Sequence, residues 1–383
     1  MRLCRLFFPL VACTVLATGC SFFSAKDELE PAKLQNFEKE ITLTKVWSKK
    51  VGSANKDYWP NLQIGSSEKA LYIADHSGSL TALDVKTGKK LWHTDLDTQV
   101  SGGVGYGEKL IVLGTIKGKI LAVNAEDGSV RWSSAVSSEV LSSPSAGQGK
   151  VVAQSIDNRL FAFDAKTGEE LWQHDTGAPI LSVRGNSSSM ILSNMVIAAF
   201  DNGKLIAFNL QNGSLLWETR LAVPKGRTEL ERMIDIDGKP LLIGDIIYSV
   251  SYQGRLGALT RGTGRNLWFQ DSSSHFSPAY SQDMLFVTEA NNDAVRAFKA
   301  GNGKEVWSND QLVYRGLTGP VNFGNGVAVA DADGYLHLLD PKSGRFTGRI
   351  KVGGAGVSAP LLVVGEILLV QTNNGSVNAF KIQ

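Results

Sequence analysis

Cysteine is scarce in this chain of 383 residues, and the three that occur, Cys4, Cys13 and Cys20, all precede residue 21. The rest of the chain therefore has no thiol for an internal disulfide or a thiolate metal site. Long apolar runs are missing as well, because nothing after residue 20 approaches the about 20 apolar residues that a membrane-spanning helix needs. The charge is nearly balanced, with 39 basic and 37 acidic residues, which argues against nucleic acid as a partner.

The first 19 residues have the pattern of an export signal. Arg2 and Arg5 supply positive charge, residues 6–17 form an apolar stretch, and two small residues precede Cys20. The stretch is too short to cross a bilayer as a helix. We expect residues 1–19 to be a cleaved signal peptide, with a buried N-terminal helix as the alternative.

The sequence LATGCS at residues 16–21 resembles the lipobox of bacterial lipoproteins, in which the cysteine after the cleavage site is acylated. The resemblance implies lipidation of Cys20, for example with palmitate. Ala17 stands where Leu is usual, and LVAC at residues 10–13 is a weaker match. Ser21 follows the cysteine in place of the Asp that marks inner-membrane retention, which implies an outer-membrane lipoprotein that faces the periplasm.

Residues 20–42 are predicted to comprise the acylated cysteine and a tether, because they lack strand alternation, although a short helix is an alternative. As a flexible coil this segment has an r.m.s. reach of roughly 25 Å. The folded body is predicted to span residues 43–383.

The body is built on a repeat with two elements. The first is a turn with a glycine, which reaches positive φ without steric cost, followed four residues later by tryptophan in all copies except the last. The copies are DVKTGKKLW at 84–92, NAEDGSVRW at 124–132, DAKTGEELW at 164–172, NLQNGSLLW at 209–217, TRGTGRNLW at 260–268, KAGNGKEVW at 299–307 and DPKSGRFTG at 340–348. We interpret these tryptophans as packing residues between neighbouring repeats, with ligand stacking as the alternative.

The second element is a hairpin followed by alternating apolar residues, such as HSGSLTALD at 76–84, which is typical of a half-buried strand. Eight hairpins occur, at Gly78, Gly118, Asn158, Gly203, Gly254, Asp293, Gly334 and Gly375. A period of about 40 residues with four short strands per unit is typical of propeller blades. The sequence therefore predicts an all-β protein, an eight-bladed β-propeller with four antiparallel strands per blade.

The ends of the chain predict how the ring closes. Eight hairpins are followed by only seven turns, because the chain stops after the strand SVNAFKI, whereas LTKVWSKKV at 43–51 carries Trp47 without a preceding turn. We expect the N-terminal strand to pair with the C-terminal blade, which protects edges that would otherwise aggregate.

Catalytic signatures are not found. The five histidines fall on separate repeats, the DADG string at 331–334 lacks the later ligands of a calcium loop, and no cofactor or metal is expected. The repeat resembles the blades of pyrroloquinoline-quinone dehydrogenases, which makes a quinone-dependent periplasmic enzyme an alternative. Those enzymes have a vicinal cysteine pair and long insertions, both missing here, so we expect a non-enzyme. A cell-wall glycan-binding propeller is a further alternative.

The longest repeat spacings, 45 and 51 residues, mark the segments after Trp172 and Trp217. Insertions on one face of a repeat protein usually mark its binding face. The apolar and charged candidates in these segments are Leu181, Val183, Arg184, Asp235 and Asp237. This combination is typical of a protein interface, the alternative being that the apolar residues are core and the charges merely solvated.

The lipobox, the eight repeats and the segments LSVRG and ELERMIDID together resemble the BamB family of outer-membrane lipoproteins. The resemblance covers the whole body and implies a scaffold of the BAM complex that binds a POTRA domain of BamA through Leu181, Val183, Arg184, Asp235 and Asp237. Val183 stands where the family commonly has Leu. The implied role is to assist folding and insertion of outer-membrane β-barrel proteins. Pairing of exposed blade edges with nascent barrel strands is a further implied contact.

Overall fold

Short strands and tight turns make up all the regular structure of the computed structural model, which describes residues 30–52, 62–177, 187–223, 227–228 and 233–383. Residues 31–383 belong to one compact unit. Within the described ranges, no helix has the length and apolar character needed to span a membrane.

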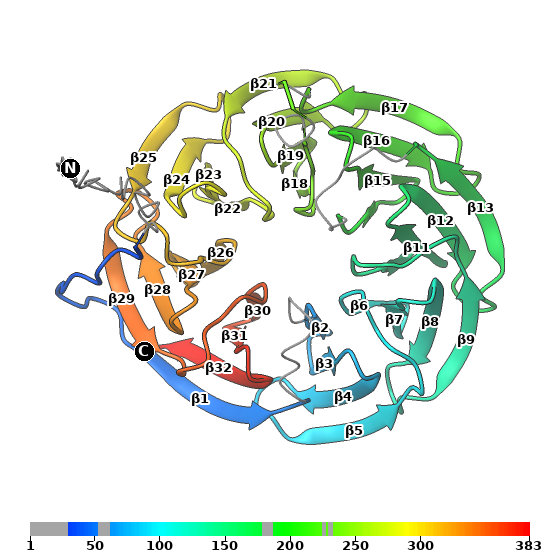
Figure 1. Cartoon of the computed structure of the whole chain (residues 1–383), viewed down its shortest axis with the longest axis horizontal. Coiled ribbons are helices and arrows are strands. Elements are labelled where there is room, and N and C mark those ends of the chain that lie inside the picture. Colours follow the sequence, from blue (N-terminus) through cyan, green and yellow to red (C-terminus); the bar gives the residue numbers. More distant parts are fainter. Residues whose placement is uncertain (1–29, 53–61, 178–186, 224–226, 229–232) are drawn as a thin grey trace, which may run out of the picture. The chain divides into compact units, whose positions relative to one another are not determined.

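The strands form eight four-stranded antiparallel sheets, which are the blades of a propeller (Figure 1). Blade 1 comprises β2 (Gly65–Ser66), β3 (Ala70–Ala74), β4 (Ser79–Asp84) and β5 (Lys90–Asp95); blade 2 comprises β6 (Gly105–Gly107), β7 (Leu110–Gly114), β8 (Lys119–Asn124) and β9 (Val130–Ala135); blade 3 comprises β10 (Ser145–Gly147), β11 (Lys150–Ser155), β12 (Arg159–Asp164) and β13 (Glu170–Asp175); blade 4 comprises β14 (Met190–Ile191), β15 (Met195–Ala199), β16 (Lys204–Asn209) and β17 (Leu215–Arg220). Blade 5 comprises β18 (Leu241–Ile243), β19 (Ile246–Val250), β20 (Arg255–Thr260) and β21 (Asn266–Asp271); blade 6 comprises β22 (Ala279–Ser281), β23 (Met284–Thr288), β24 (Val295–Lys299) and β25 (Glu305–Asn309); blade 7 comprises β26 (Val321–Phe323), β27 (Gly326–Ala330), β28 (Tyr335–Leu339) and β29 (Phe346–Lys351); blade 8 comprises β30 (Leu362–Val364), β31 (Ile367–Gln371), β32 (Ser376–Ile382) and β1 (Leu43–Lys50). The prediction of an eight-bladed propeller is confirmed.

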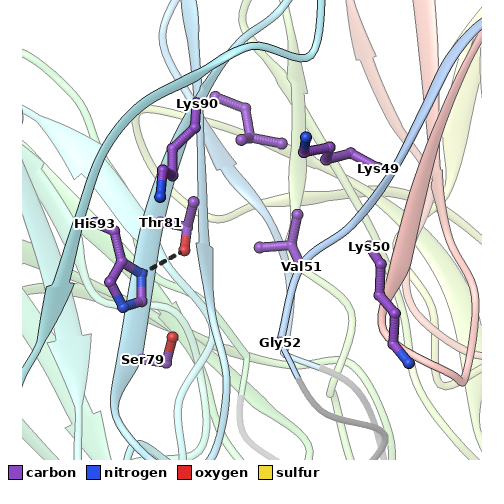
Figure 2. A pocket seen from close by; sticks show the side chains of 9 residues that line it. Lys49, Lys50, Val51, Gly52, Ser79, Thr81, Lys90 and His93 are labelled. Carbon is purple, nitrogen blue, oxygen red and sulfur yellow. Dashed lines mark hydrogen bonds between the residues drawn. The ribbon is translucent and has the colours of Figure 1, made fainter.

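The ring closes through strands from the two ends of the body. β1 pairs antiparallel with β32, from Leu43 opposite Ile382 to Lys50 opposite Ser376, with one irregularity before Trp47. This register confirms the predicted pairing of the N-terminal strand with the last blade. The end of β1 then lies beside β4 and β5 of blade 1 (Figure 2).

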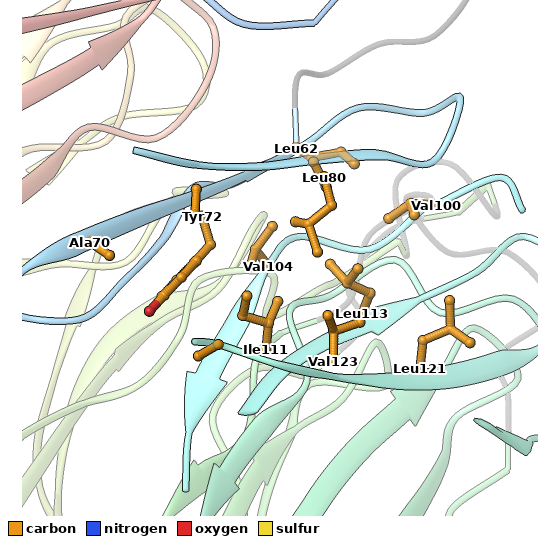
Figure 3. Packing of buried hydrophobic residues seen from close by; sticks show 13 residues of the cluster. Leu62, Ala70, Tyr72, Leu80, Val100, Val104, Ile111, Leu113, Leu121 and Val123 are labelled. Atoms are coloured by element: carbon orange, nitrogen blue, oxygen red, sulfur yellow. The ribbon is translucent and has the colours of Figure 1, made fainter. Parts of the chain in front are cut away.

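The hydrophobic core is divided among the interfaces between neighbouring blades. In one such cluster, Tyr72 and Leu80 of blade 1 pack with Ile111, Leu113 and Val123 of blade 2 (Figure 3). Strands in the middle of a blade have both faces covered in this way, which explains why β3 and β7 are buried over their whole lengths. Each blade thus depends on its two neighbours for burial of its apolar residues.

The seven tryptophans of the outer strands lie at these interfaces and make one recurring contact. Each indole Nε1 donates a hydrogen bond to a carbonyl of the next blade at 2.9–3.1 Å: Trp47 to Val85, Trp92 to Ala125, Trp132 to Ala165, Trp172 to Leu210, Trp217 to Arg261, Trp268 to Ala300 and Trp307 to Pro341. The ring of each also covers the turn glycine of that blade. At Gly168, for example, φ is +75° and a Cβ would lie 2.6 Å from Trp132, so both conformation and space require glycine. The predicted packing role is confirmed.

Blade 7 has Gly348 in place of the tryptophan, and the closure of the ring explains the exchange. Blade 8 has no turn between its third and fourth strands, because its outer strand comes from the other end of the chain. No turn is therefore present to receive an indole. A Cβ at Gly348 would instead lie 3.0 Å from the carbonyl oxygen of Ile41.

Residues 31–42, which we call the N-terminal segment, pack on blade 7. The amides of Glu40 and Ile41 both donate to the Thr347 carbonyl at 2.9 Å, and the rings of Phe37 and Phe346 lie 5.4 Å apart. This part of the predicted tether is thus held against the propeller.

Candidate functional site

Two of the predicted contact residues, Asp235 and Asp237, lie in the described part of the chain. Leu181, Val183 and Arg184 lie outside the described residues, as does the predicted lipidation site Cys20. The geometry of the candidate site is therefore that of the connection between blades 4 and 5 and its neighbours.

The backbone around Asp235 is anchored to blade 5. The amide of Tyr252, in the hairpin between β19 and β20, donates to the Asp235 carbonyl at 2.7 Å and forms an isolated antiparallel bridge. Ile234 and Ile236 on either side are buried, at 3% and 0% exposure. The connection is therefore held in place by one backbone bridge and two apolar side chains.

The Asp235 side chain is fully buried among other carboxyl groups. Its nearest polar neighbours are the Ile236 amide and the Asp237 carboxyl group, and neither Asp235 oxygen forms a hydrogen bond of regular geometry. Burial, followed by the negative charges of Asp237 and Asp201, raises the pKa of Asp235 to about 10. A carboxyl group in such surroundings is neutral at pH 7. In the unbound protein the Asp235 side chain is thus uncharged and inaccessible to a partner.

Asp237 is more accessible and belongs to a polar contact between blades. Its Oδ2 lies 3.1 Å from Nδ1 of His275, and the side chain is 15% exposed, compared with 34% for the histidine. The His275 ring stacks on Tyr252 at 4.2 Å between centroids. Tyr252 therefore links the two aspartates, through its backbone to Asp235 and through its ring to the partner of Asp237.

Sequence reasoning did not identify Asp201, Tyr252 and His275 as members of this site. Asp201 lies in the hairpin between β15 and β16, and His275 lies between β21 and β22. They are brought near Asp235 and Asp237 only by the packing of blades 4 and 5, and no motif links them along the chain.

An exposed apolar residue lies in the same connection as the carboxylates. Val223, which follows β17, is 48% exposed. An accessible apolar side chain with charged residues in one surface connection is typical of a protein interface. In the described ranges, no group of three His, Cys, Asp or Glu residues is arranged to hold a metal ion.

The buried histidine of the ring, His337, is part of a structural network. Its Nε2 donates to Asp331 at 3.1 Å, and its Nδ1 accepts from Arg349 Nε at 3.0 Å. Burial lowers the pKa of His337, which agrees with a neutral ring that donates at one nitrogen and accepts at the other. Gly334 follows Asp331 with φ +82° in the hairpin, so the DADG string forms a turn, as predicted.

Comparison with known proteins shows the same repeat in proteins of outer-membrane assembly. The family model described as "Outer membrane protein assembly factor BamB" matches residues 76–309 and 291–383. The chain is 47% identical to the outer membrane protein assembly factor BamB of Pseudomonas aeruginosa over 98% of each chain. The crystal structure of BamB from Moraxella catarrhalis matches with a TM-score of 0.82 and 28% identity, over 89% of this chain and all of that one. Quinohemoprotein alcohol dehydrogenase from Comamonas testosteroni matches with a TM-score of 0.66 at 14% identity over 88% of this chain and 76% of that one, a likeness of fold alone.

Proposed function

Because this chain belongs to the BamB family of outer membrane protein assembly factors, we propose that it is a non-catalytic scaffold that binds a POTRA domain of BamA in the BAM complex. In this role it assists the folding and insertion of outer-membrane β-barrel proteins. The observation that carries the proposal is the connection between blades 4 and 5, where Asp237 is 15% exposed beside His275 and Val223 is 48% exposed.

The two aspartates have different tasks in this proposal. Asp237, at the protein surface, pairs with a cationic or hydrogen-bond-donating group of BamA. Asp235 is inaccessible and acts through the backbone bridge that positions the connection. Leu181, Val183 and Arg184, in the preceding interblade segment, supply the apolar contact and the positive charge.

Charge reversal at one predicted contact residue in each segment tests the assignment. We expect Arg184→Glu with Asp237→Lys to reduce co-purification of BamA at least about tenfold, since close interfacial charge pairs contribute more than about 1.4 kcal/mol. The matched control is Lys86→Glu with Glu126→Lys, two exposed residues in turns of blades 1 and 2. Wild-type levels of BamA on the first variant, with unchanged thermal stability, would remove this face from the proposal.

Membrane attachment is proposed to occur through a lipid on Cys20, on the periplasmic side of the outer membrane. Two acyl signals or more are needed for stable anchoring, and an acylated N-terminal cysteine supplies them. Cys20→Ser should therefore move the protein from the outer-membrane fraction to the soluble periplasmic fraction. If the Cys20→Ser variant stayed in the outer-membrane fraction and still bound BamA, the proposed lipid anchor would be wrong, whereas the proposed binding of BamA would be unaffected.

A second proposed contact is between the outer strands of the blades and the strands of nascent barrel proteins. The residue before the tryptophan is exposed by 40–54% in six blades: Val46, Leu91, Leu171, Leu216, Leu267 and Val306. Unpaired strand edges with accessible apolar side chains are suited to β-augmentation. A photo-cross-linking residue placed at an outer-strand position such as Leu267 tests this contact. We expect it to cross-link to unfolded barrel protein, and the same cross-linking residue at a turn position such as Gly301 should not.

Two other functions have direct assays. Quinone-dependent dye reduction by the purified protein would favour a dehydrogenase, and retention on peptidoglycan would favour a glycan-binding propeller. We expect neither dye reduction nor retention on peptidoglycan, because the chain belongs to a family of outer membrane protein assembly factors.

A further inference from the structure

A cationic groove lies where the ring closes, between blade 8 and blade 1. It has a volume of about 310 Å³, and its lining includes Lys49, Lys50, Ser79, Thr81, Lys90 and His93. Lys49 extends from the end of β1 toward blade 1, and Lys90, Thr81 and His93 stand on the opposite wall (Figure 2). We call it the lysine groove.

Two positions distinguish this interface from those between blades 1 and 2 and between blades 2 and 3. The residue two places after the tryptophan usually bonds the turn glycine of the next blade, as Thr94 does to the Gly128 carbonyl at 3.0 Å and Thr219 to the Gly264 carbonyl at 2.6 Å. Lys49 occupies that place in β1 and makes no such bond in the described structure. The cross-blade hydrogen bond is thus replaced by a cationic side chain.

The second difference is the size of a side chain on β4. Thr81 pairs with His93 beside the Ala82 and Trp92 pair. The residues at the same register in blades 2, 3 and 4 are Leu121, Phe161 and Ile206. A large apolar side chain fills this position in these three blades. In blade 5 the residue is Gly257, and the Leu221 and Phe269 side chains lie against it. Blade 1 has the small Thr81 beside His93, which leaves space.

The charges in and around the groove favour an anion. Among the described residues, Lys49, Lys50 and Lys90 have no ion-pair partner. Two carboxylates lie nearby and are outnumbered by these three lysines. Asp95 lies 3.3 Å from His93 Nε2, and Asp75, beside Gly52, accepts hydrogen bonds from the amides of Ser77 and Ser79. Lysine ammonium groups are common ligands of phosphate, as point charges with three donors each.

From this arrangement we propose that the lysine groove binds a phosphate group. Lys49 approaches from one wall, and Lys90 with the Ser79 hydroxyl approaches from the other, where the Thr81 hydroxyl is bonded to His93 Nδ1 at 2.9 Å. A phosphate, with three or more acceptor oxygens and up to two negative charges, can accept from more of these donors at once than a carboxylate with two oxygens and one charge. The volume is at the lower end of small-molecule sites and leaves room for one substituent. The phosphate belongs either to a lipid headgroup or to a free phosphorylated compound.

The test uses the full-length lipidated protein in a neutral detergent, with three probes: inorganic phosphate, glycerol 1-phosphate and short-chain dihexanoyl phosphatidylglycerol. Binding is measured by calorimetric titration at constant ionic strength, with acetate as the carboxylate comparison. We expect saturable binding of at least one phosphate probe. Lys49→Ala with Lys90→Ala should weaken it at least about tenfold.

Two further variants separate the groove from general surface charge. Lys86→Ala with Lys89→Ala removes two exposed lysines of the same blade that do not line the groove, and should change binding less than about twofold. Thr81→Leu introduces the side chain found at this register in blade 2, and should abolish binding with the thermal unfolding temperature retained.

Each outcome of the titrations decides the proposal or the source of the phosphate. Binding of dihexanoyl phosphatidylglycerol alone supports the site and assigns a lipid headgroup, whereas binding of the two water-soluble phosphates supports it and assigns a free compound. No saturation with any phosphate probe, equal binding of acetate, or equal losses in the two double-lysine variants would overturn it.

Discussion

At the residue scale, burial changes what a charged side chain can do. Asp235 has the sequence context of a surface contact, yet its side chain is fully buried next to Asp201 and Asp237. Such a carboxyl group keeps its proton, because the charged form would lose hydration and face two negative neighbours. Asp237, two residues later, keeps access to solvent and is the better candidate for direct contact with a partner.

The raised pKa of Asp235 predicts a pH-dependent stability. Between the ordinary value of 3.8 and the folded-state value of about 10, the folded protein holds a proton that the unfolded chain releases, so stability falls as pH rises. Below about pH 4 both states are protonated and this penalty vanishes. Asp235→Asn should therefore stabilise the protein more at pH 8 than at pH 5, with a difference of up to about 1.4 kcal/mol for each pH unit.

Urea unfolding of the wild type and the variant at both pH values measures this difference. Asp127→Asn, in an exposed turn, is the control. An equal effect of Asp235→Asn at pH 5 and pH 8 would mean that Asp235 is ionised in the folded protein.

At the element scale, blades 1 to 6 each contribute a tryptophan to one neighbour and a glycine turn to the other. The two features are coupled, since the indole covers the turn and bonds the carbonyl beside it. Blade 8 has no such turn, and blade 7 correspondingly has Gly348 in place of tryptophan, with Ile41 of the N-terminal segment near it. The irregular last copy of the repeat is thus a consequence of how the ring closes.

This coupling predicts that placing the tryptophan of the regular repeat at position 348 lowers the stability of the folded protein. Gly348→Trp should destabilise the protein by about 1–3 kcal/mol, because the new side chain must displace the N-terminal segment and finds no turn to cover. Thermal unfolding measures the effect. Gly354→Ala is the control, since a Cβ there meets nothing within 4 Å. A rise in unfolding temperature for Gly348→Trp would show that blade 7 accepts the regular pattern.

At the scale of the whole molecule, the ring is closed by hydrogen bonds between residues more than 300 positions apart. Leu43 lies opposite Ile382 in the β1 and β32 pair. Because blades bury their apolar residues against both neighbours, opening this pair would expose two interfaces at once. The N-terminal segment adds contacts to blade 7 beside the closure.

A disulfide across the closing pair tests this arrangement in a body that has no other cysteine. Thr44 and Lys381 are directly opposite, so Thr44→Cys with Lys381→Cys should form an intramolecular disulfide on mild oxidation and raise stability by about 2–5 kcal/mol. Thiol titration and unfolding with and without reductant measure both effects. Lys381→Cys alone is the control, and free thiols in the oxidised double variant would contradict the closure.

Much of the architecture could be read from the sequence because its signals are local. Turn glycines, alternating apolar residues and tryptophans at a constant spacing recur about every 40 residues, and the surplus strand with Trp47 completes the count. These features predicted the blades, the packing role of the tryptophans and the closing pair.

The sequence by itself determined the repeat, and hence the number of blades and the partner of the N-terminal strand, because each depends on neighbours within a few residues or on counting. Only the tertiary structure decided which distant side chains meet. It buried Asp235, brought His275 to Asp237, and set Lys49 opposite Lys90 across an interface between blades. Burial and contact across blades depend on packing of segments far apart in the chain, which local patterns do not encode.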